Sequence, residues 1–139
     1  MSENFVPALS PEELAALLKQ GTEQRAEWML ADIAENEEVW ALENADGWVV
    51  GKLATPIPHG PAYALTLWPR QELAAMEAHG PDEQPKSVDL ETLLEDLLPE
   101  IEERGWGVLA FCVKNAGQAY RASEFSEACV NAWEALSED

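Results

Sequence analysis

The stretch EEVWALENADGWVV, residues 37–50, constrains the fold more than any other part of the chain. Trp40 and Leu42 alternate with their neighbours before its centre, and Trp48 and Val50 do so after it, with the period of two that is typical of strands. The centre, NADG, consists of residues that accept tight turns. Because strands joined by so short a turn pair antiparallel, we predict a hairpin whose two tryptophans lie on one face and belong to the core.

A pair of helices is expected before this hairpin, within residues 10–36. Ser10 opens the first helix with a capping box, and Gly21 ends it. Thr22 can cap the second helix, which carries apolar residues at helical spacing and ends near Asn36.

The segment SVDLETLLEDLLPEIEERG, residues 87–105, has the clearest helical pattern in the chain. At about 100° per residue, its leucines and its isoleucine fall on one half of the helix and its acids on the other. Pro99 removes one backbone hydrogen bond, so it should kink or restart the helix. A terminal helix capped by Ser123 carries a second apolar stripe, formed by Phe125, Ala128, Cys129, Ala132, Trp133 and Leu136.

The remaining segments complete an α+β pattern. Strands are expected at residues 63–68 and 107–113, and a short helix at 69–76. The second strand is apolar enough to be covered on both faces. Irregular loops and a turn are expected at residues 55–61, 80–85 and 115–117. We predict a single domain over residues 1–139, with the helical pair at 10–36 and a sheet-helix region at 37–139. It contains an antiparallel sheet of about four strands with helices packed mainly on one face.

The charge of the chain narrows its possible partners. Its 27 acidic residues outnumber its 8 basic ones, and the formal net charge is −19. Nucleic acids and anionic membranes would repel such a surface, because binding either normally needs a patch of lysine and arginine. A basic protein would be attracted. We therefore expect a basic protein partner, no direct contact with nucleic acid and no membrane association.

The cysteines and the N-terminal residues indicate a cytoplasmic protein. The first residues lack a basic and apolar signal segment, and no window is as apolar as a membrane span. Cys112 and Cys129 lie in apolar surroundings without a C-x-x-C spacing, so we predict buried thiols in a reducing compartment.

No motif in the sequence indicates an enzyme. His59 and His79 stand singly in separate loops, which argues against a metal site, and no phosphate-binding glycine motif occurs. Cys112 with His59 could act as a nucleophile and its base, yet a thiol within an apolar strand is usually inert. We expect no catalytic residue, no metal and no cofactor.

The acidic half of the helix near residue 100 is the best candidate site. Glu102 and Glu103 lie in its last turn, where the helix dipole disfavours negative charge by about 0.3 to 1 kcal/mol each. The tryptophans that fit the core patterns least well, Trp28 and Trp106, are candidate anchors for a partner. The predicted partner-binding residues are Glu91, Glu95, Asp96, Glu102, Glu103, Trp28 and Trp106.

The order of these features resembles a bacterial family known as domain of unknown function 2750. Its members share a W-x-L and G-W hairpin, a W-P-H element after a loop containing proline, and a long helix containing L-P before a strand and a terminal helix. The corresponding elements here are Trp40-Ala41-Leu42, Gly47-Trp48, Leu67-Trp68-Pro69, the helix with Pro99, and the strand 107–113. Arg70 stands where the family often has histidine. The resemblance spans about residues 22–136 and implies a fold but no activity.

Three functions are compatible with the sequence. The first is an acidic module that neutralises a basic partner, as an immunity protein inhibits a bacterial toxin. The second is a nucleic-acid mimic whose carboxylates imitate phosphates and inhibit an enzyme that binds DNA or RNA. The third is an enzyme or a small-ligand protein with a pocket near residues 58–63 and Trp68.

Overall fold

The computed structural model describes residues 10–53, 57, 60–78, 80, 82–113 and 116–137, the side chain of residue 137 excepted. Its helices are α1 Pro11–Leu18, α2 Thr22–Asn36, α3 Gln71–Met76, α4 Leu90–Thr92, the π-helical turn η1 Leu93–Leu97, α5 Leu98–Glu103 and α6 Ala122–Ser137. Its strands are β1 Glu38–Asn44, β2 Gly47–Trp48, β3 Val50–Lys52, β4 Tyr63–Leu67, β5 Gln84–Asp89, β6 Gly107–Val113 and β7 Ala116–Arg121. The predicted α+β class is confirmed.

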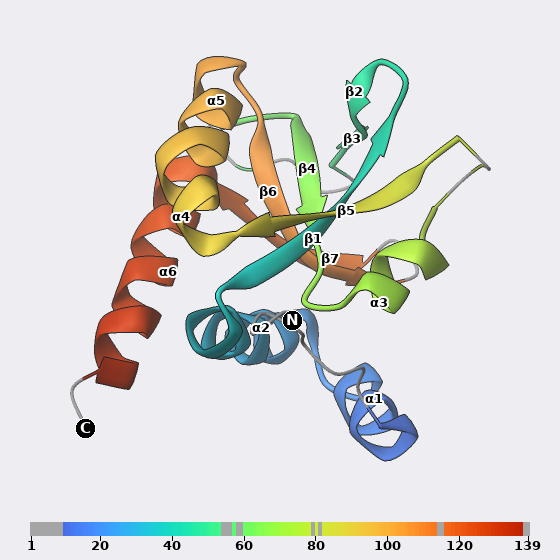
Figure 1. The fold of residues 1–139 in the computed structure, drawn as a ribbon, viewed down its shortest axis with the longest axis vertical. Coiled ribbons are helices and arrows are strands. Elements are labelled where there is room, and N and C mark those ends of the chain that lie inside the picture. Colours follow the sequence, from blue (N-terminus) through green and yellow to red (C-terminus); the bar gives the residue numbers. More distant parts are fainter. Residues whose placement is uncertain are drawn as a thin grey trace, which may run out of the picture.

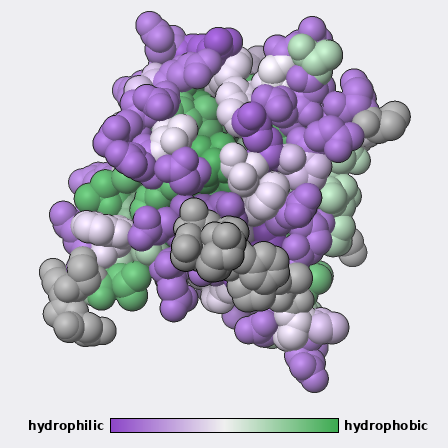
Figure 2. Space-filling view, viewed as in Figure 1, coloured by the Kyte–Doolittle hydropathy of each residue, from purple (hydrophilic) through white to green (hydrophobic). Residues whose placement is uncertain are grey.

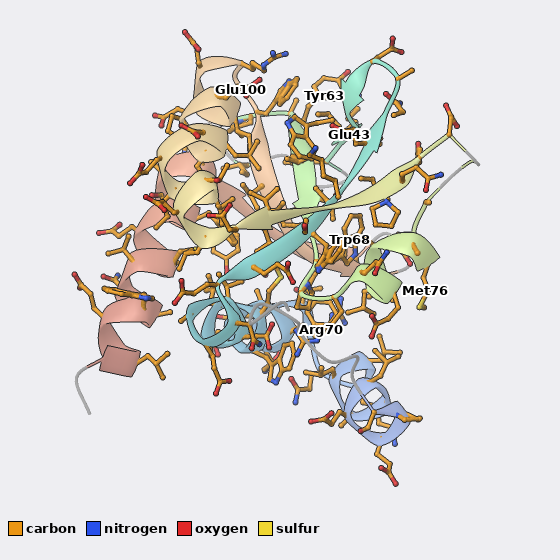
Figure 3. The ribbon with its side chains drawn as sticks, in the orientation of Figure 1. Glu43, Tyr63, Trp68, Arg70, Met76 and Glu100 are labelled. Carbon is orange, nitrogen blue, oxygen red and sulfur yellow. The ribbon has the colours of Figure 1, made fainter. Side chains whose placement is uncertain are left out.

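The strands form two sheets instead of the single sheet predicted. One has the order β3-β4-β6-β7 and contains a parallel pair, β4 with β6; the other has the order β2-β1-β5 and is antiparallel. β1 crosses the end of β4, where the backbones of Trp40 and Trp68 exchange two hydrogen bonds of 2.8 Å (Figures 1 and 3). The two sheets are thus joined at one bridge.

Two strands were not predicted from the sequence. β5 contains Pro85 and buries only Val88 among its six residues, so it has no apolar alternation that would mark a strand. It lies at the edge of its sheet, where a proline does not interrupt the hydrogen bonds of a central strand. β7 lies at an edge too, and none of its described side chains is fully buried. Because both strands lie at sheet edges and bury few side chains, neither has the apolar pattern from which a strand could be predicted.

Most helix boundaries lie close to the predicted ones, but the helix expected over residues 87–105 begins only at Leu90, because residues 87–89 belong to β5. The capping box of Ser10 is confirmed, since its side chain accepts from the Glu13 amide at 3.1 Å. Gly21, predicted to end α1, is the N-cap of α2, and Thr22 is already helical. α6 begins one residue before Ser123, which is therefore not its cap.

The hairpin of β1 and β2 is present, but the predicted placement of its tryptophans is wrong. Glu43 pairs with Trp48 and Asn44 with Gly47 across a two-residue turn. Paired residues share a face of the sheet, so Trp48 lies on the face of Glu43, and Trp40 lies on the other. Both tryptophans are half-buried against the core. The ladder continues for only two residues before β3 joins the other sheet.

Pro99 restarts the predicted long helix after a π-helical turn. The amide of Leu98 donates to the carbonyl of Leu93, five residues back. This spacing aligns Leu93 and Leu98, which an α-helix would place about 140° apart, and both are at most 2% exposed. Pro99, which has no N–H, follows at once in the first turn of α5.

One core lies between the helices and the four-stranded sheet. α2 and α6 pack on the face of that sheet that carries Leu65, Leu67 and Val108, all 0% exposed. β6 is central, as predicted, and nearly all of its residues are buried. Among the described residues, no helix combines the length and the apolar composition needed to cross a membrane.

Candidate functional site

Six carboxylates project from α4, η1 and α5 and form what we call the acidic face: Glu91, Glu95, Asp96, Glu100, Glu102 and Glu103. All are exposed except Glu100, which is half-buried. Hydrophilic residues cover this part of the molecule in Figure 2. The five acidic residues predicted from the sequence are thus all exposed.

Five of these carboxylates surround one depression. It is shallow, has a volume of about 570 Å³, and is lined by Glu95, Asp96, Pro99, Glu100, Glu102 and Glu103. Glu91 lies one turn before it and does not line it. Glu100, which was not among the predicted residues, belongs to this depression and lies at the end of the molecule formed by α5 (Figure 3).

The local backbone explains why the carboxylates gather around Pro99. Residues three and four positions apart share a helix face, so Glu95 and Asp96 before Pro99 and Glu102 and Glu103 after it lie around the proline ring. The last turn of α5 contains Glu102 and Glu103 and no basic residue, so the helix dipole adds to the negative potential there.

One cation lies directly after the acidic face. Arg104 pairs with Glu100 at 2.9 Å, and its guanidinium lies 5.2 Å from the centre of the Trp106 ring. The pair is exposed, so solvent screens most of its attraction. Arg104 therefore offsets only part of the charge.

The predicted tryptophan anchors behave differently from one another. Trp106 follows α5, and its stacking with Arg104 places it beside the acidic face. Trp28 is half-buried on α2, packs edge-on against Phe111 with ring centres 6.1 Å apart, and does not line the depression. Trp133 was predicted to be core, yet it is 46% exposed, because the end of α6 extends past the elements that would cover it (Figure 1). The most exposed tryptophan is thus one that helical periodicity assigned to the core.

Both thiols are buried, as predicted, and Cys112 and Cys129 are not joined in a disulfide. Burial raises the pKa of Cys129 to about 12, so it stays protonated at neutral pH and is a poor nucleophile. His59 and His79 lie outside the described residues, and so does any pairing of His59 with Cys112. Among the described residues, no group of three histidine, cysteine or carboxylate side chains could hold a metal ion.

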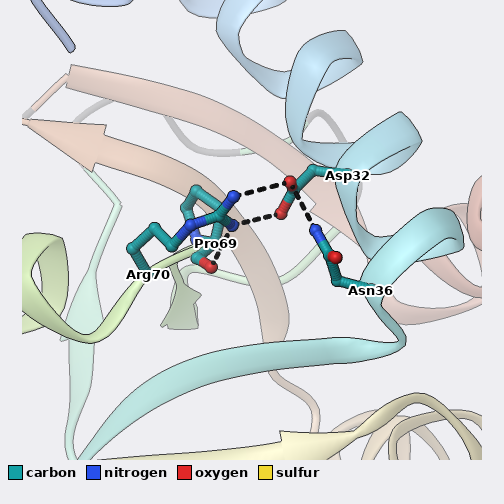
Figure 4. Close-up of polar contacts among 4 residues, drawn as sticks. All are labelled: Asp32, Asn36, Pro69 and Arg70. Atoms are coloured by element: carbon teal, nitrogen blue, oxygen red, sulfur yellow. Dashed lines mark hydrogen bonds and ion pairs between the residues drawn. The ribbon is translucent and has the colours of Figure 1, made fainter. Parts of the chain in front are cut away.

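A second charged cluster, not predicted from the sequence, lies inside the molecule (Figure 4). Arg70 donates to both carboxylate oxygens of Asp32, at 2.6 and 3.1 Å, and also to the carbonyl of Pro69. Asn36 donates to the same carboxylate at 2.9 Å, and the ring of Trp28 lies 5.8 Å from the guanidinium. We call this cluster the buried seam. It fastens α2 to the segment between β4 and α3.

The comparisons with known proteins identify a family but no better-known relative. The model of the family described as "Protein of unknown function (DUF2750)" matches residues 26–129. This range contains the acidic face, the buried seam and every strand of the described residues, and it confirms the resemblance seen in the sequence motifs. No curated protein and no solved structure matches the chain.

Proposed function

Since the chain belongs to the DUF2750 family, whose description gives no function, we propose from its surface that it is an acidic protein-binding module that neutralises a basic partner. The acidic face carries this proposal. Its carboxylates point into solvent around one depression, and Arg104, the basic residue that follows them, already pairs with Glu100. Exposed charge of one sign can be paired by a protein that presents the opposite sign.

The mechanism is recognition by charge followed by contact. A net charge of −19 attracts a basic protein from a distance and raises its rate of association. The carboxylates of the acidic face then pair with lysine and arginine, and Trp106 beside them supplies an aromatic contact. Salt slows this association, because the Debye length falls from about 30 Å at 0.01 M to about 10 Å at 0.1 M.

The partner class that we propose is a toxin domain, which makes the chain an immunity protein of the cytoplasm. Toxins that cleave nucleic acid surround their active sites with lysine and arginine, because they must bind phosphates. An acidic face docked over such a site blocks it without any catalysis by the chain. No metal or cofactor takes part in this mechanism.

Two variants of equal charge test the proposal. The first neutralises the acidic face with Glu91→Gln, Glu95→Gln, Asp96→Asn, Glu102→Gln and Glu103→Gln. The matched control carries Glu12→Gln, Glu23→Gln, Glu27→Gln, Glu35→Gln and Glu127→Gln, all at exposed positions elsewhere. Each variant changes the net charge from −19 by +5 to −14.

The wild-type chain and both variants are used to retain partners from a cell lysate at low salt. We expect one basic protein to be retained by the wild type and the control, to be lost with the acidic-face variant, and to elute as salt rises. Co-expression then measures whether the chain protects cells from that protein. Equal retention by both variants, or a retained protein that is harmless to cells, would contradict the proposal.

A further inference from the structure

A groove lies over the face of the four-stranded sheet opposite the one on which α2 and α6 pack, and its lining also includes Thr22, the first residue of α2. Its volume is about 980 Å³, at the upper end of the range of about 300 to 1,000 Å³ typical of ligand sites. Trp68, Ala64 and Ile57 line it, so it adjoins the region near residues 58–63 and Trp68 where a small-ligand pocket was considered.

The floor of this groove is formed by Leu109 and by four small residues around it. Gly51 pairs with Ala64 on neighbouring strands, and Thr66 pairs with Leu109, which pairs in turn with Ala119. Paired residues share a face, so all five project from the same side of the sheet, and all line the groove. A floor of this kind lets a flat molecule approach the backbone closely.

A β-bulge in β6 shapes one end of the groove. The register with β7 shifts between Ala110 and Val113, so β6 holds one more residue there than its partner. Leu109 and Cys112, three residues apart, would face opposite sides of a regular strand, but both line the groove. Phe111 takes a left-handed conformation, with φ of 53°, and is fully buried on the helix side against Trp28.

The bulge is held by specific contacts. A left-handed aromatic residue costs about 1 to 3 kcal/mol, and such strain persists where surrounding contacts fix it. The indole of Trp68 donates to the carbonyl of Cys112 at 2.7 Å, and the guanidinium of Arg25 lies 5.7 Å from the centre of the Phe111 ring. The strained backbone thus widens the apolar lining of the groove towards Cys112.

The walls and rim indicate the chemistry of an occupant. Leu42 and Val49 of the hairpin and Leu53 are apolar walls. The charged lining residues are Lys52, Glu77 and Glu83, and both glutamates are half-buried, whereas Lys52 is exposed. The lining thus carries two acidic groups against one basic group, so its potential is negative, and the net charge of −19 adds to that potential.

We propose that this groove binds a small, mainly apolar molecule that carries one positively charged amine, with its apolar body on the sheet and its amine at Glu77 and Glu83. The site is separate from the acidic face, since the two share no lining residue. It also needs no macromolecular partner.

Three probes of one shape and different charge test the proposal: phenylbutylamine, phenylbutanol and phenylbutyrate. Each is titrated into the full chain by NMR, with the Trp68 indole N–H as a reporter inside the groove. We expect the amine to bind about tenfold more tightly than the carboxylate, with the alcohol between them. Failure of all three probes to bind, or equal affinity of amine and carboxylate, overturns the proposal.

Three variants locate the site. Gly51→Leu adds a side chain where a Cβ would have no neighbour within 4 Å, so the fold tolerates it while the groove is filled and binding is lost. Glu77→Gln lowers the affinity for the amine towards that for the alcohol, and Glu27→Gln, an exposed position outside the groove, leaves it unchanged. Unchanged binding of the amine by Gly51→Leu overturns the proposal. We expect the acidic-face variant to bind the amine as tightly as the wild type does. A result that contradicts the amine site therefore leaves the proposed partner surface untouched, and the reverse also holds.

Discussion

The buried seam contains an arginine-carboxylate pair, and a second such pair joins Glu100 of the acidic face to the adjoining Arg104, but the two pairs have different physical roles. In the seam, Arg70 and Asp32 have side chains only 8% and 6% exposed, and Asn36 and the Pro69 carbonyl supply further hydrogen bonds. On the acidic face, the side chains of Arg104 and Glu100 are 55% and 42% exposed. The buried charges hold the fold together, whereas the exposed carboxylates remain available to a partner. Position in the fold, more than residue type, therefore decides which charges can serve binding.

The largest effect is expected from breaking the buried pair. Asp32→Asn removes the carboxylate to which the buried Arg70 guanidinium donates two hydrogen bonds, and breaking a buried pair in this way typically costs about 3 to 5 kcal/mol of unfolding free energy. Urea denaturation followed by tryptophan fluorescence measures the loss. The double variant Asp32→Leu with Arg70→Met removes both charges and should recover a large part of it. A loss below about 1 kcal/mol in Asp32→Asn would show that the seam is no more important than a surface pair.

This seam was beyond sequence reasoning because its parts lie far apart in the chain. Asp32 falls on α2, and Arg70 follows β4, so nothing local links them. The sequence motifs show only that Arg70 stands where the family often has the histidine of its W-P-H element. Its role depends on the crossing of β1 over β4, and that crossing is a tertiary feature.

The acidic face and the central strand were predictable because their signals are local. The apolar stripe of residues 90–101 and the apolar run 107–113 each predict which side chains are buried, and the structure buries most of them. The groove was only partly predictable, because its floor comes from pairings across four strands, and one of these, β7, has no apolar pattern and was missed. Small residues such as Gly51 and Ala119 do not indicate a site in the sequence, because only the pairing of the strands brings them to one face of the sheet.

The second-largest effect concerns a buried group with no charged partner. Burial disfavours the thiolate and raises the pKa of Cys129 from the ordinary value of 9.0 to about 12 in the fold. Its contribution to stability is therefore complete below pH 9 and is lost as the pH rises from 9 to 12. The slope is about 1.4 kcal/mol per pH unit, so about 2 kcal/mol should be lost by roughly pH 10.5.

Urea midpoints at pH 8 and at higher pH check this prediction in wild type and in Cys129→Ala. The alanine variant is less stable at every pH, since it leaves a cavity, but its stability should fall less steeply with pH. Parallel curves for the two proteins would mean that the Cys129 thiol ionises in the fold as easily as in the unfolded chain.

A smaller and opposite effect is expected at the end of α5. Glu102→Gln and Glu103→Gln each remove a negative charge from the negative end of the helix dipole, so each should stabilise the fold by about 0.3 to 1 kcal/mol at low salt. The matched substitution Glu12→Gln, in the first turn of α1, should destabilise slightly, because the dipole favours an acid there. If Glu102→Gln and Glu12→Gln shifted the urea midpoint in the same direction, the dipole argument would be wrong. The cost of Glu102 and Glu103 to the fold would then no longer support their role in binding.

The smallest effect is expected for Glu100→Gln, which removes the surface pair. The loss of an exposed ion pair with Arg104 costs about 0.2 to 1 kcal/mol. The same substitution removes one carboxylate from a depression lined by four others. The repulsion that is relieved stabilises the fold by a similar amount, so the two effects oppose each other. The net change should lie within about 0.5 kcal/mol of zero at low salt and closer to zero at about 1 M salt, where the Debye length is about 3 Å. A loss comparable to that of Asp32→Asn would mean that Glu100 stabilises the fold as strongly as the buried seam does, and the acidic face would then lose its claim to be free for a partner.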